Sequence, residues 1–416
     1  LLLLPPPLPP PTLPLTTVLL STSRYYFNYR HASNPLLLLP LLLPSSSSPS
    51  SSVSVWLGDE VACNPRNAYK SGITATSNTP LSNLFTFPPC YGVGGGGSGG
   101  DAAVPLLLPT QPPSQTNPVG YLSSQTPENF LSILTGRNAY PGVPRTGTYR
   151  PYSAPTTDNT NNDNNPSNIR NNDNNWLVYL AGHGGDGFLK FGDVEELSGE
   201  DLLAALGEMR SLGRYDKMLV IVDTCQAGTI TNSWRGEGWE GGRGFTPHRS
   251  RRGTAQYELH GVSPEVRDMI GPDVYFIGSS SLLENSYAHH SSPTLGVAVV
   301  DRFTRSLASF LGRSRGDYWD VGGRYYNGGN GPTLRDMVES FRAGEIKAHV
   351  SVTSSNPGTD DDAGSGGKKG GTGGWDGGLG GVYLWEFFGV PERKVKVANA
   401  DDDAAADDGG GGGGGG

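Results

Sequence analysis

One cysteine and one histidine each follow an apolar run, at positions where they could serve a nucleophilic reaction. Cys225 comes shortly after Met218–Val222, and His183 comes shortly after Trp176–Ala181. A thiolate is a strong nucleophile, and a neighbouring imidazole can take the thiol proton during attack. The residue types therefore predict a Cys225–His183 dyad for attack on an acyl group, provided that the fold brings the two together.

The elements that would position this dyad can be predicted from the same segment. Both apolar runs are short and continuous, which is typical of strands buried on both faces of a sheet. Between them, Ser198 is a favourable helix N-cap, and Leu202, Leu206 and Met209 recur at helical spacing. Strand, helix and strand form a βαβ unit with parallel strands and a right-handed crossover. Both strand ends should therefore open on one edge of the sheet, where ligands bind in such folds.

Glycines surround the histidine in the run Gly182–Gly187. Without a Cβ, they let a substrate backbone approach closely, and they leave the Gly184 amide free to face a developing oxyanion. A phosphate-binding loop would need a following Gly-Lys-Ser/Thr, which is not present. The pattern favours acyl chemistry over nucleotide binding.

Each residue also has a plain structural interpretation. A cysteine after a buried strand is often a small core residue, and a single histidine in a glycine-rich loop is often not catalytic. A zinc site would need further cysteines or histidines close to Cys225 or His183, and the sequence has none there. The pair His289–His290 has no cysteine nearby and favours a surface position. We therefore expect a catalytic dyad, no metal site and no cofactor.

The remaining periodic segments complete an α/β domain. A helix is predicted over Leu295–Leu311, where Val299, Phe303, Leu307 and Phe310 repeat at helical spacing. Further strands are predicted at Thr17–Ser21, Val55–Leu57, Val274–Ile277 and Val382–Phe387. These elements predict a three-layer α/β/α domain with a mainly parallel central sheet.

Composition limits the function classes. The formal net charge is −9, which argues against a protein that binds nucleic acid through phosphates. Three cysteines are too few for a disulfide scaffold. No apolar run reaches the length of a membrane-spanning helix, and prolines interrupt the opening leucine run, which is either a signal-peptide remnant or a proline-rich tail.

Low-complexity stretches interrupt the domain, because 61 Gly and 33 Pro are concentrated in them together with Ser and Asn. We expect tails over 1–16 and 399–416, one domain over 17–353, a Gly-rich linker over 354–381 and a last strand region over 382–398. Disordered insertions are expected near 35–54, 94–118, 156–175, 235–253 and 312–331.

The blocks Tyr179–Phe191 and Val222–Ala227 resemble the legumain-like cysteine peptidases, and within them the glycosylphosphatidylinositol (GPI) transamidase branch. Further blocks agree in order along the chain, namely Ser23–His31, Ala62–Asn67, Pro127–Arg137, Gly278–Ser280, Glu284–Tyr287 and Gly296–Phe303. The resemblance implies a caspase-like α/β/α fold.

The resemblance also implies residue roles. Cys225 corresponds to the nucleophile, His183 to the general base and Asn28 to the residue that orients the histidine. The amides of Gly184 and Cys225 correspond to the oxyanion hole. Arg30, Ser279 and Ser280 match positions that line the substrate pocket. Cys63 matches a cysteine that is joined to a partner subunit by a disulfide, and Cys90 matches no known role.

The implied activity is acyl transfer in GPI-anchor attachment. A thioester would form at the C-terminal signal of a proprotein, and the ethanolamine amine of the GPI lipid would resolve it. Partners would be the other subunits of a GPI transamidase complex, at the lumenal side of the endoplasmic reticulum and membrane-associated through that complex. Two alternatives stay open, namely a legumain-type asparaginyl endopeptidase that hydrolyses the thioester and a non-catalytic scaffold.

The sequence also departs from this family. After His31, the prolines in Pro35–Pro44 predict no regular helix where the family has one. The acidic segment that can hold calcium before the Glu128 helix is replaced by Gly and Pro runs, and neither an initiator Met nor the family's C-terminal transmembrane helix is present. These departures indicate either a mis-assembled gene or a divergent protein that folds poorly.

Overall fold

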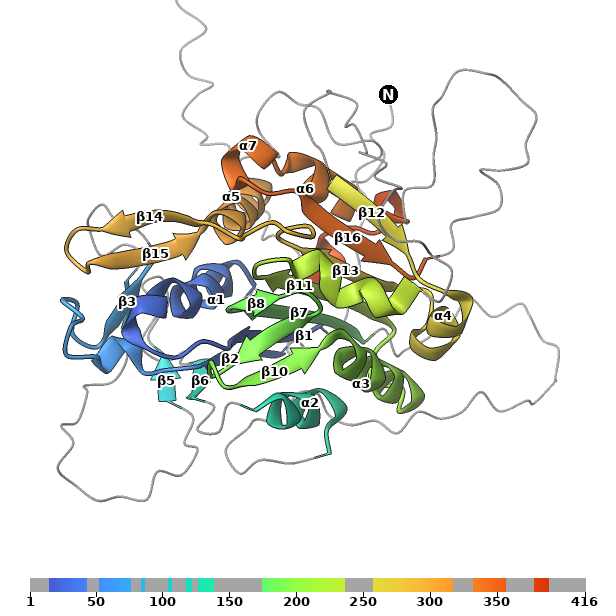
Figure 1. Cartoon of the computed structure of the whole chain (residues 1–416), viewed down its shortest axis with the longest axis horizontal. Helices are drawn as coiled ribbons and strands as arrows, with labels where there is room; N and C mark the ends of the chain where they lie inside the picture. Colours follow the sequence, from blue (N-terminus) through green and yellow to red (C-terminus); the bar gives the residue numbers. More distant parts are fainter. Residues whose placement is uncertain are drawn as a thin grey trace, which may run out of the picture.

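A nine-stranded sheet runs through the middle of the protein, with helices on both sides of it (Figure 1). The computed structural model describes residues 15–42, 52–75, 84–86, 104–106, 117–121, 126–137, 174–235, 257–316, 332–356 and 378–388. Cys90 and most of the predicted tails, insertions and linker lie outside these ranges, so the predicted domain boundaries stay predictions.

The sheet is mainly parallel, as the sequence predicts. Its strands, in order across the sheet, are β12 (Tyr257–Gly261), β16 (Val350–Ser354), β13 (Val274–Gly278), β11 (Lys217–Asp223), β7 (Asn175–Ala181), β1 (Leu15–Ser21), β2 (Ser52–Leu57), β6 (Asn117–Tyr121) and β5 (Val104–Leu106). The six strands from β13 to β6 are parallel to one another, while β16 is antiparallel to β13 and β5 is antiparallel to β6.

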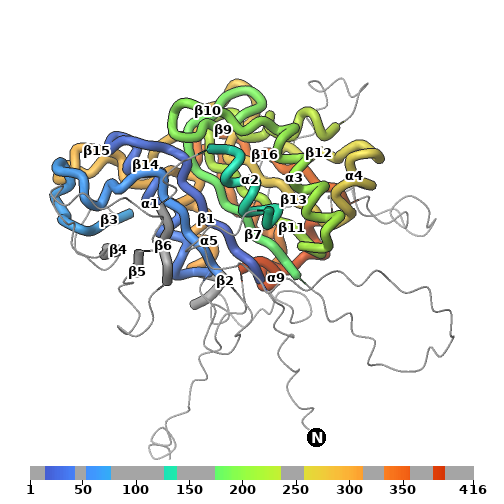
Figure 2. Tube along the Cα trace, turned by 90° about the horizontal axis from the view of Figure 1, so that it is seen from below, coloured from blue at the N-terminus to red at the C-terminus, as the bar shows by residue number. Residues whose placement is uncertain are grey.

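Two hydrophobic cores lie on opposite faces of this sheet. Leu19, Tyr179 and Ile221 pack in one core with α1 (Tyr29–Leu42), α5 (Arg302–Gly316) and α6 (Leu334–Ser340). The intervening residues of the same strands, such as Val178, pack in the other core with α2 (Pro127–Thr135), α3 (Gly199–Ser211) and α4 (Pro264–Ile270). Because the strands alternate between two helix-covered faces, the three-layer α/β/α class is confirmed (Figure 2).

Shorter elements surround this framework. They are the sheets β8 (Gly184–Gly185) with β9 (Phe188–Phe191) and β10 (Glu195–Ser198), β14 (Ala288–Ser292) with β15 (Val297–Asp301), and β3 (Gly72–Thr74) with β4 (Leu84–Thr86). Two short helices are α7 (Ala343–Ile346) and α9 (Trp385–Phe388), and the 3₁₀ helices are η1 (Tyr26–Asn28), η2 (Val61–Cys63), η3 (Ala227–Arg235) and η4 (Leu379–Gly381). Within the described residues, no helix has the length and apolar character needed to cross a membrane.

The prediction of no regular helix after His31 is wrong. Helix α1 continues through Pro35 and Pro40 to Leu42. A proline inside a helix costs about 3 kcal/mol. Buried leucines after Pro35 pack against the sheet, and each contributes about 1.5–3 kcal/mol, so tertiary packing offsets the local cost.

Other boundaries also differ from the prediction. The helix expected over Leu295–Leu311 is a strand, β15, followed by α5, because the valines of β15 pair with β14. The strand expected over Val382–Phe387 is replaced by one isolated bridge and the helix α9, which follow η4. Glu386 in α9 forms an ion pair with Lys217 of β11. The described parts of regions 35–54 and 94–118 belong to α1, β2, β5 and β6, and the predicted insertions in these regions stay predictions.

Candidate active site

The predicted dyad residues follow neighbouring parallel strands at the same offset. Ala181 at the end of β7 pairs with Asp223 at the end of β11, so His183 and Cys225 each lie two residues beyond a matched pair. The link continues past the strands, because the Gly182 N–H donates to the Asp223 carbonyl over 3.3 Å. The βαβ prediction is confirmed, with α3 between the strands and the Ser198 side chain capping it through the Asp201 N–H.

The loop after His183 lies directly against the residue before Cys225. A Cβ atom added at Gly184 would lie 2.5 Å from the Thr224 Oγ1 atom, so only glycine fits there. This close approach brings the Gly184 backbone beside the nucleophile loop. The geometry supports the predicted oxyanion role of Gly184, which stays a prediction.

The nucleophile loop itself leaves one amide available. The N–H groups of Thr224, Ala227 and Gly228 are bonded to Ser279 or Ser280, and the Gln226 N–H donates to the Glu284 carbonyl. Among the described residues, the Cys225 N–H has no hydrogen-bond acceptor. An unused amide at the nucleophile is the donor that a developing oxyanion requires.

Gln226 gives the loop its sharp turn. Its φ of 55° lies in the left-handed region, which is uncommon for a residue other than glycine. Its side-chain oxygen accepts from the Leu283 N–H over 3.2 Å, and its carbonyl accepts from the Thr229 N–H. These bonds hold a strained backbone in place directly after Cys225, which is a free and partly exposed thiol.

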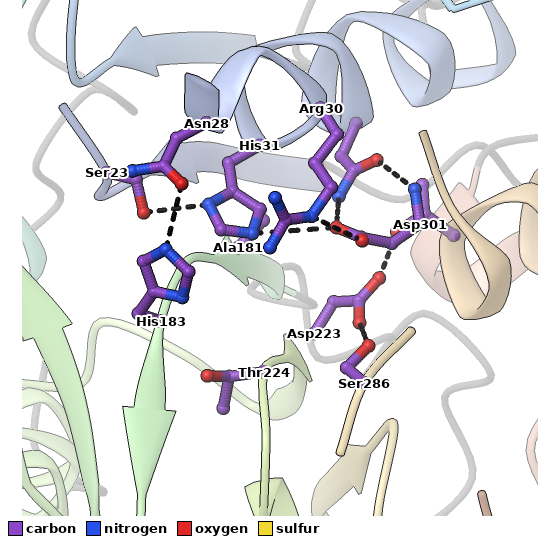
Figure 3. A network of polar contacts seen from close by, with 12 residues as sticks. Ser23, Asn28, Arg30, His31, Ala181, His183, Asp223, Thr224, Ser286 and Asp301 are labelled. Carbon is purple, nitrogen blue, oxygen red and sulfur yellow. Dashed lines mark hydrogen bonds and ion pairs between the residues drawn. The ribbon is translucent and has the colours of Figure 1, made fainter. Parts of the chain in front are cut away.

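Asn28 is hydrogen-bonded to His183, which supports its predicted orienting role; that role stays a prediction. The Asn28 Nδ2 group donates to the Arg24 carbonyl over 2.7 Å, which turns the amide oxygen toward His183. That oxygen lies 2.8 Å from His183 Nε2 (Figure 3). Because an amide oxygen only accepts, Nε2 carries the proton and Nδ1 keeps its lone pair. His183 is thus fixed in the tautomer that a general base requires.

The electrostatics keep this imidazole neutral. Burial lowers the pKa of His183 most, the charges of Arg30 and Lys190 lower it further, and Asp193 opposes them. A neutral imidazole near neutral pH is ready to accept the thiol proton.

The predicted substrate-pocket residues divide into two groups. The Arg30 guanidinium bonds to the Asp301 carboxylate over 2.9 Å, and its side chain remains 18% exposed. By contrast, Ser279 and Ser280 are fully buried, and both hydroxyls bond to the Thr224 carbonyl. These contacts make the two serines supports of the nucleophile loop, and their assignment to the substrate pocket stays a prediction.

Sequence reasoning missed a buried polar network behind the dyad (Figure 3). His31 Nδ1 lies 2.8 Å from Ser23 Oγ, and the His31 ring meets the His183 ring edge-on with centroids 4.9 Å apart. Asp301 accepts from Asn34 over 2.6 Å, and Asp223 accepts from Ser286 over 2.6 Å. All of these residues except Asn34 fall within the blocks that carry the resemblance, but neither their spacing nor their type indicates that they meet.

Cys63 forms a disulfide, whereas Cys225 is a free thiol. The structure contains one chain, and a sulfur atom holds one disulfide at a time. The bond is therefore an alternative to the inter-subunit disulfide that the resemblance implies. Cys90 lies outside the described residues.

Within the described part of the chain, no three His, Cys, Asp or Glu side chains are grouped so that they could hold a metal ion. His289 and His290 lie together on β14, and burial and the charge of Arg305 lower the pKa of both. Their surroundings are cationic and do not favour a cation.

Comparisons with known proteins agree with this geometry. Residues 156–237, which contain both dyad positions, match the Peptidase C13 family. The chain is similar to the GPI-anchor transamidase of Saccharomyces cerevisiae, with 27% identity over 326 residues, 78% of this chain and 56% of that protein. It is 33% identical to the GPI-anchor transamidase of Schizosaccharomyces pombe over 178 residues, 43% of this chain and 35% of that protein.

A third similar protein is the GPI-anchor transamidase of Homo sapiens, with 29% identity over 284 residues, 68% of this chain and 50% of that protein. The chain thus spans about half the length of the curated relatives it matches.

Proposed function

Because residues 156–237 match the Peptidase C13 family and the chain is similar to GPI-anchor transamidases, we propose that it is the catalytic component of a GPI-anchor transamidase and uses Cys225 as its nucleophile. The observation that carries the proposal is the Asn28–His183 hydrogen bond of 2.8 Å at the end of β7, beside the free thiol that follows β11. An isolated core cysteine would need neither a fixed imidazole tautomer nor an unused amide.

The first half-reaction cleaves a peptide bond. Cys225 Sγ attacks the carbonyl carbon while His183 Nδ1 takes the thiol proton, and the carbonyl oxygen becomes an oxyanion that accepts from the amides of Cys225 and Gly184. The C–N bond then breaks, and His183 gives its proton to the departing amine. A thioester between the substrate acyl group and Cys225 remains.

The second half-reaction decides the product. An incoming amine attacks the thioester carbonyl, loses its proton to His183 and releases the Cys225 thiolate, which is then reprotonated. The amine proposed is the ethanolamine phosphate of a GPI lipid, because the relatives are transamidases by name. If water attacked in its place, the product would be a free acid and the protein a legumain-type endopeptidase.

The wider assignment follows from the same relatives. The proposed substrates are proproteins with a C-terminal GPI signal, and the proposed partners are the remaining subunits of the transamidase. The proposed location is the lumenal side of the endoplasmic reticulum membrane. The other subunits of the complex would keep this chain associated with the membrane. Arg30, partly exposed beside the dyad, is proposed to contact the substrate.

The test is product analysis of the co-expressed complex. A peptide carrying a GPI signal is incubated with and without hydroxylamine, and the products are identified by mass spectrometry. A hydroxamate supports transfer, whereas a free acid alone with or without the amine supports hydrolysis. Cys225→Ala should give neither product, and Ser233→Ala, an exposed change on η3, should match the wild type. Absence of both products in the wild type would leave only the scaffold alternative.

A further inference from the structure

His31 is a second histidine in contact with His183, and the proposed chemistry leaves it without a role. Its side chain is buried, with 2% of the residue exposed. It lies in the first turn of α1, which directly follows η1, the 3₁₀ helix that supplies Asn28. Histidine buried so fully is uncommon unless its nitrogens are satisfied.

Three different elements hold the His31 ring (Figure 3). Ser23, in the loop after β1, places its hydroxyl 2.8 Å from Nδ1. Asp301, at the end of β15, places a carboxylate oxygen 3.8 Å from Nε2. The His183 ring stands against it at an interplanar angle of 80°. Because the ring is buried and its nitrogens face Ser23 and Asp301, we give His31 no direct part in the chemistry.

The surroundings of His31 favour its neutral form with the proton on Nε2. A hydroxyl that donates to Nδ1 leaves the proton on Nε2, which then points toward Asp301. Burial lowers the pKa of His31 well below its ordinary value, and the charges of Arg30 and His183 add to this effect. The ring therefore stays neutral when His183 becomes an imidazolium during attack.

We propose that His31 is a positioning residue for the general base: its buried ring, fixed by Ser23 and Asp301, holds the His183 ring in place and keeps water from its inner side. This inference rests on the proposed function, in which His183 is the base. Burial is the largest cause of the lowered His183 pKa, and His31 forms part of the wall that produces that burial. Arg30, Lys190 and Asp193 are the charged groups that also act on His183.

The experiment measures alkylation of Cys225 by chloroacetamide in the complex, as a function of pH, with the modified peptide identified by mass spectrometry. No GPI substrate is needed, so the result is independent of whether transfer or hydrolysis occurs. In His31→Ala, water reaches the inner side of His183, its pKa rises, and the acid limb of the profile should move up by about one pH unit. His31→Phe keeps a ring in the space and should leave the limb close to the wild type.

Two further variants complete the test. Ser23→Ala releases the His31 ring and should move the limb in the same direction by a smaller amount. His289→Ala, on β14 and outside this network, is the matched control and should not move it. In the peptide assay, His31→Ala should lower kcat about 10- to 100-fold and leave KM within about twofold, because positioning of the base affects the chemical step.

The outcomes separate the two proposals. If the acid limb of the alkylation profile lies at the same pH in His31→Ala as in the His289→Ala control, the proposed role of His31 is overturned, even if transfer activity is intact. If circular dichroism shows that His31→Ala does not fold, Ser23→Ala decides in its place by the same comparison. A wild-type complex that alkylates with the expected profile but makes no product overturns the transamidase proposal and leaves the His31 inference standing.

Discussion

The buried carboxyl group of Asp301 lies close enough to Asp223 that the negative charge of Asp223 makes Asp301 harder to ionise. Burial is the largest cause, and together with the charge of Asp223 it raises the pKa of Asp301 to about 7, although Arg30 and Asn34 oppose the shift. The pKa of Asp223 is also raised, mainly by burial. Asp301, beside Arg30, therefore titrates near neutral pH, and the neighbouring Asp223 is also harder to ionise than a free aspartate.

Folding stability should therefore depend on pH through Asp301. In the unfolded chain this group ionises near its model value of 3.8, whereas in the folded chain it stays protonated up to about 7. The folded state then binds more protons than the unfolded state between these values, so the free energy of unfolding falls as pH rises through this window.

The comparison of wild type with Asp301→Asn isolates this contribution. Urea unfolding at about pH 4.5 and pH 7 should show that the wild type loses more stability on going to pH 7 than the variant does. The Asn side chain keeps the shape but does not titrate. If the two proteins lose the same free energy of unfolding between these pH values, Asp301 ionises normally in the folded state.

Cys225 and His183 should behave as one catalytic unit. Cys225→Ala and His183→Ala should each lower kcat by about 10⁴-fold or more, and the double variant should be no worse than the more severe single variant. Peptide turnover is measured alongside circular dichroism, which should be unchanged. Losses that add in the double variant would show that the two residues act independently.

Asn28→Ala should reduce activity less severely, because it releases the tautomer of His183 without removing the base. We expect kcat to fall about 10- to 100-fold with little change in KM. Asn28→Asp keeps an oxygen acceptor for His183 Nε2 but gives up the bond to the Arg24 carbonyl. It should recover part of the loss at a pH where its carboxyl group is ionised. Equal activities of the Ala and Asp variants at every pH would contradict the orienting role.

Ser280→Ala tests the support of the nucleophile loop. It removes the donor to the Thr224 carbonyl and the acceptor of the Ala227 N–H, both of which are buried. We expect a loss of about 1–3 kcal/mol in the free energy of unfolding and slower alkylation of Cys225. Ser233→Ala, at an exposed serine, is the matched control for both measurements. If Ser280→Ala is as stable and as reactive as this control, Ser280 does not support the nucleophile loop.

The disulfide of Cys63 can be assigned by peptide mapping of the complex without reducing agent. The structure predicts that the Cys63 peptide is crosslinked to another peptide of the same chain. A crosslink to a peptide of another subunit would favour the pairing that the resemblance implies. Cys63→Ser removes either crosslink and serves as the control.

The sequence was informative where a pattern is local. The runs that became β7 and β11, the cap at Ser198 and the positions of His183 and Cys225 follow from burial and periodicity within one segment. The α1 helix was missed because local proline chemistry argued against it, and only contacts from distant strands make it favourable. His31 and Asp301 could not be paired in advance, since no spacing rule relates side chains that meet only across α1 and β15.

The order of the strands across the sheet also sets when the site can exist during synthesis. The first strand made, β1, lies between β2 and β7, and β7 is made only after a long intervening stretch of chain. The nucleophile loop then depends on Ser279, Ser280 and Glu284, which leave the ribosome after Cys225. A nascent chain that ends soon after Cys225 thus exposes a thiol with an incomplete loop. The loop around Cys225 can therefore be complete only after most of the described domain has been made.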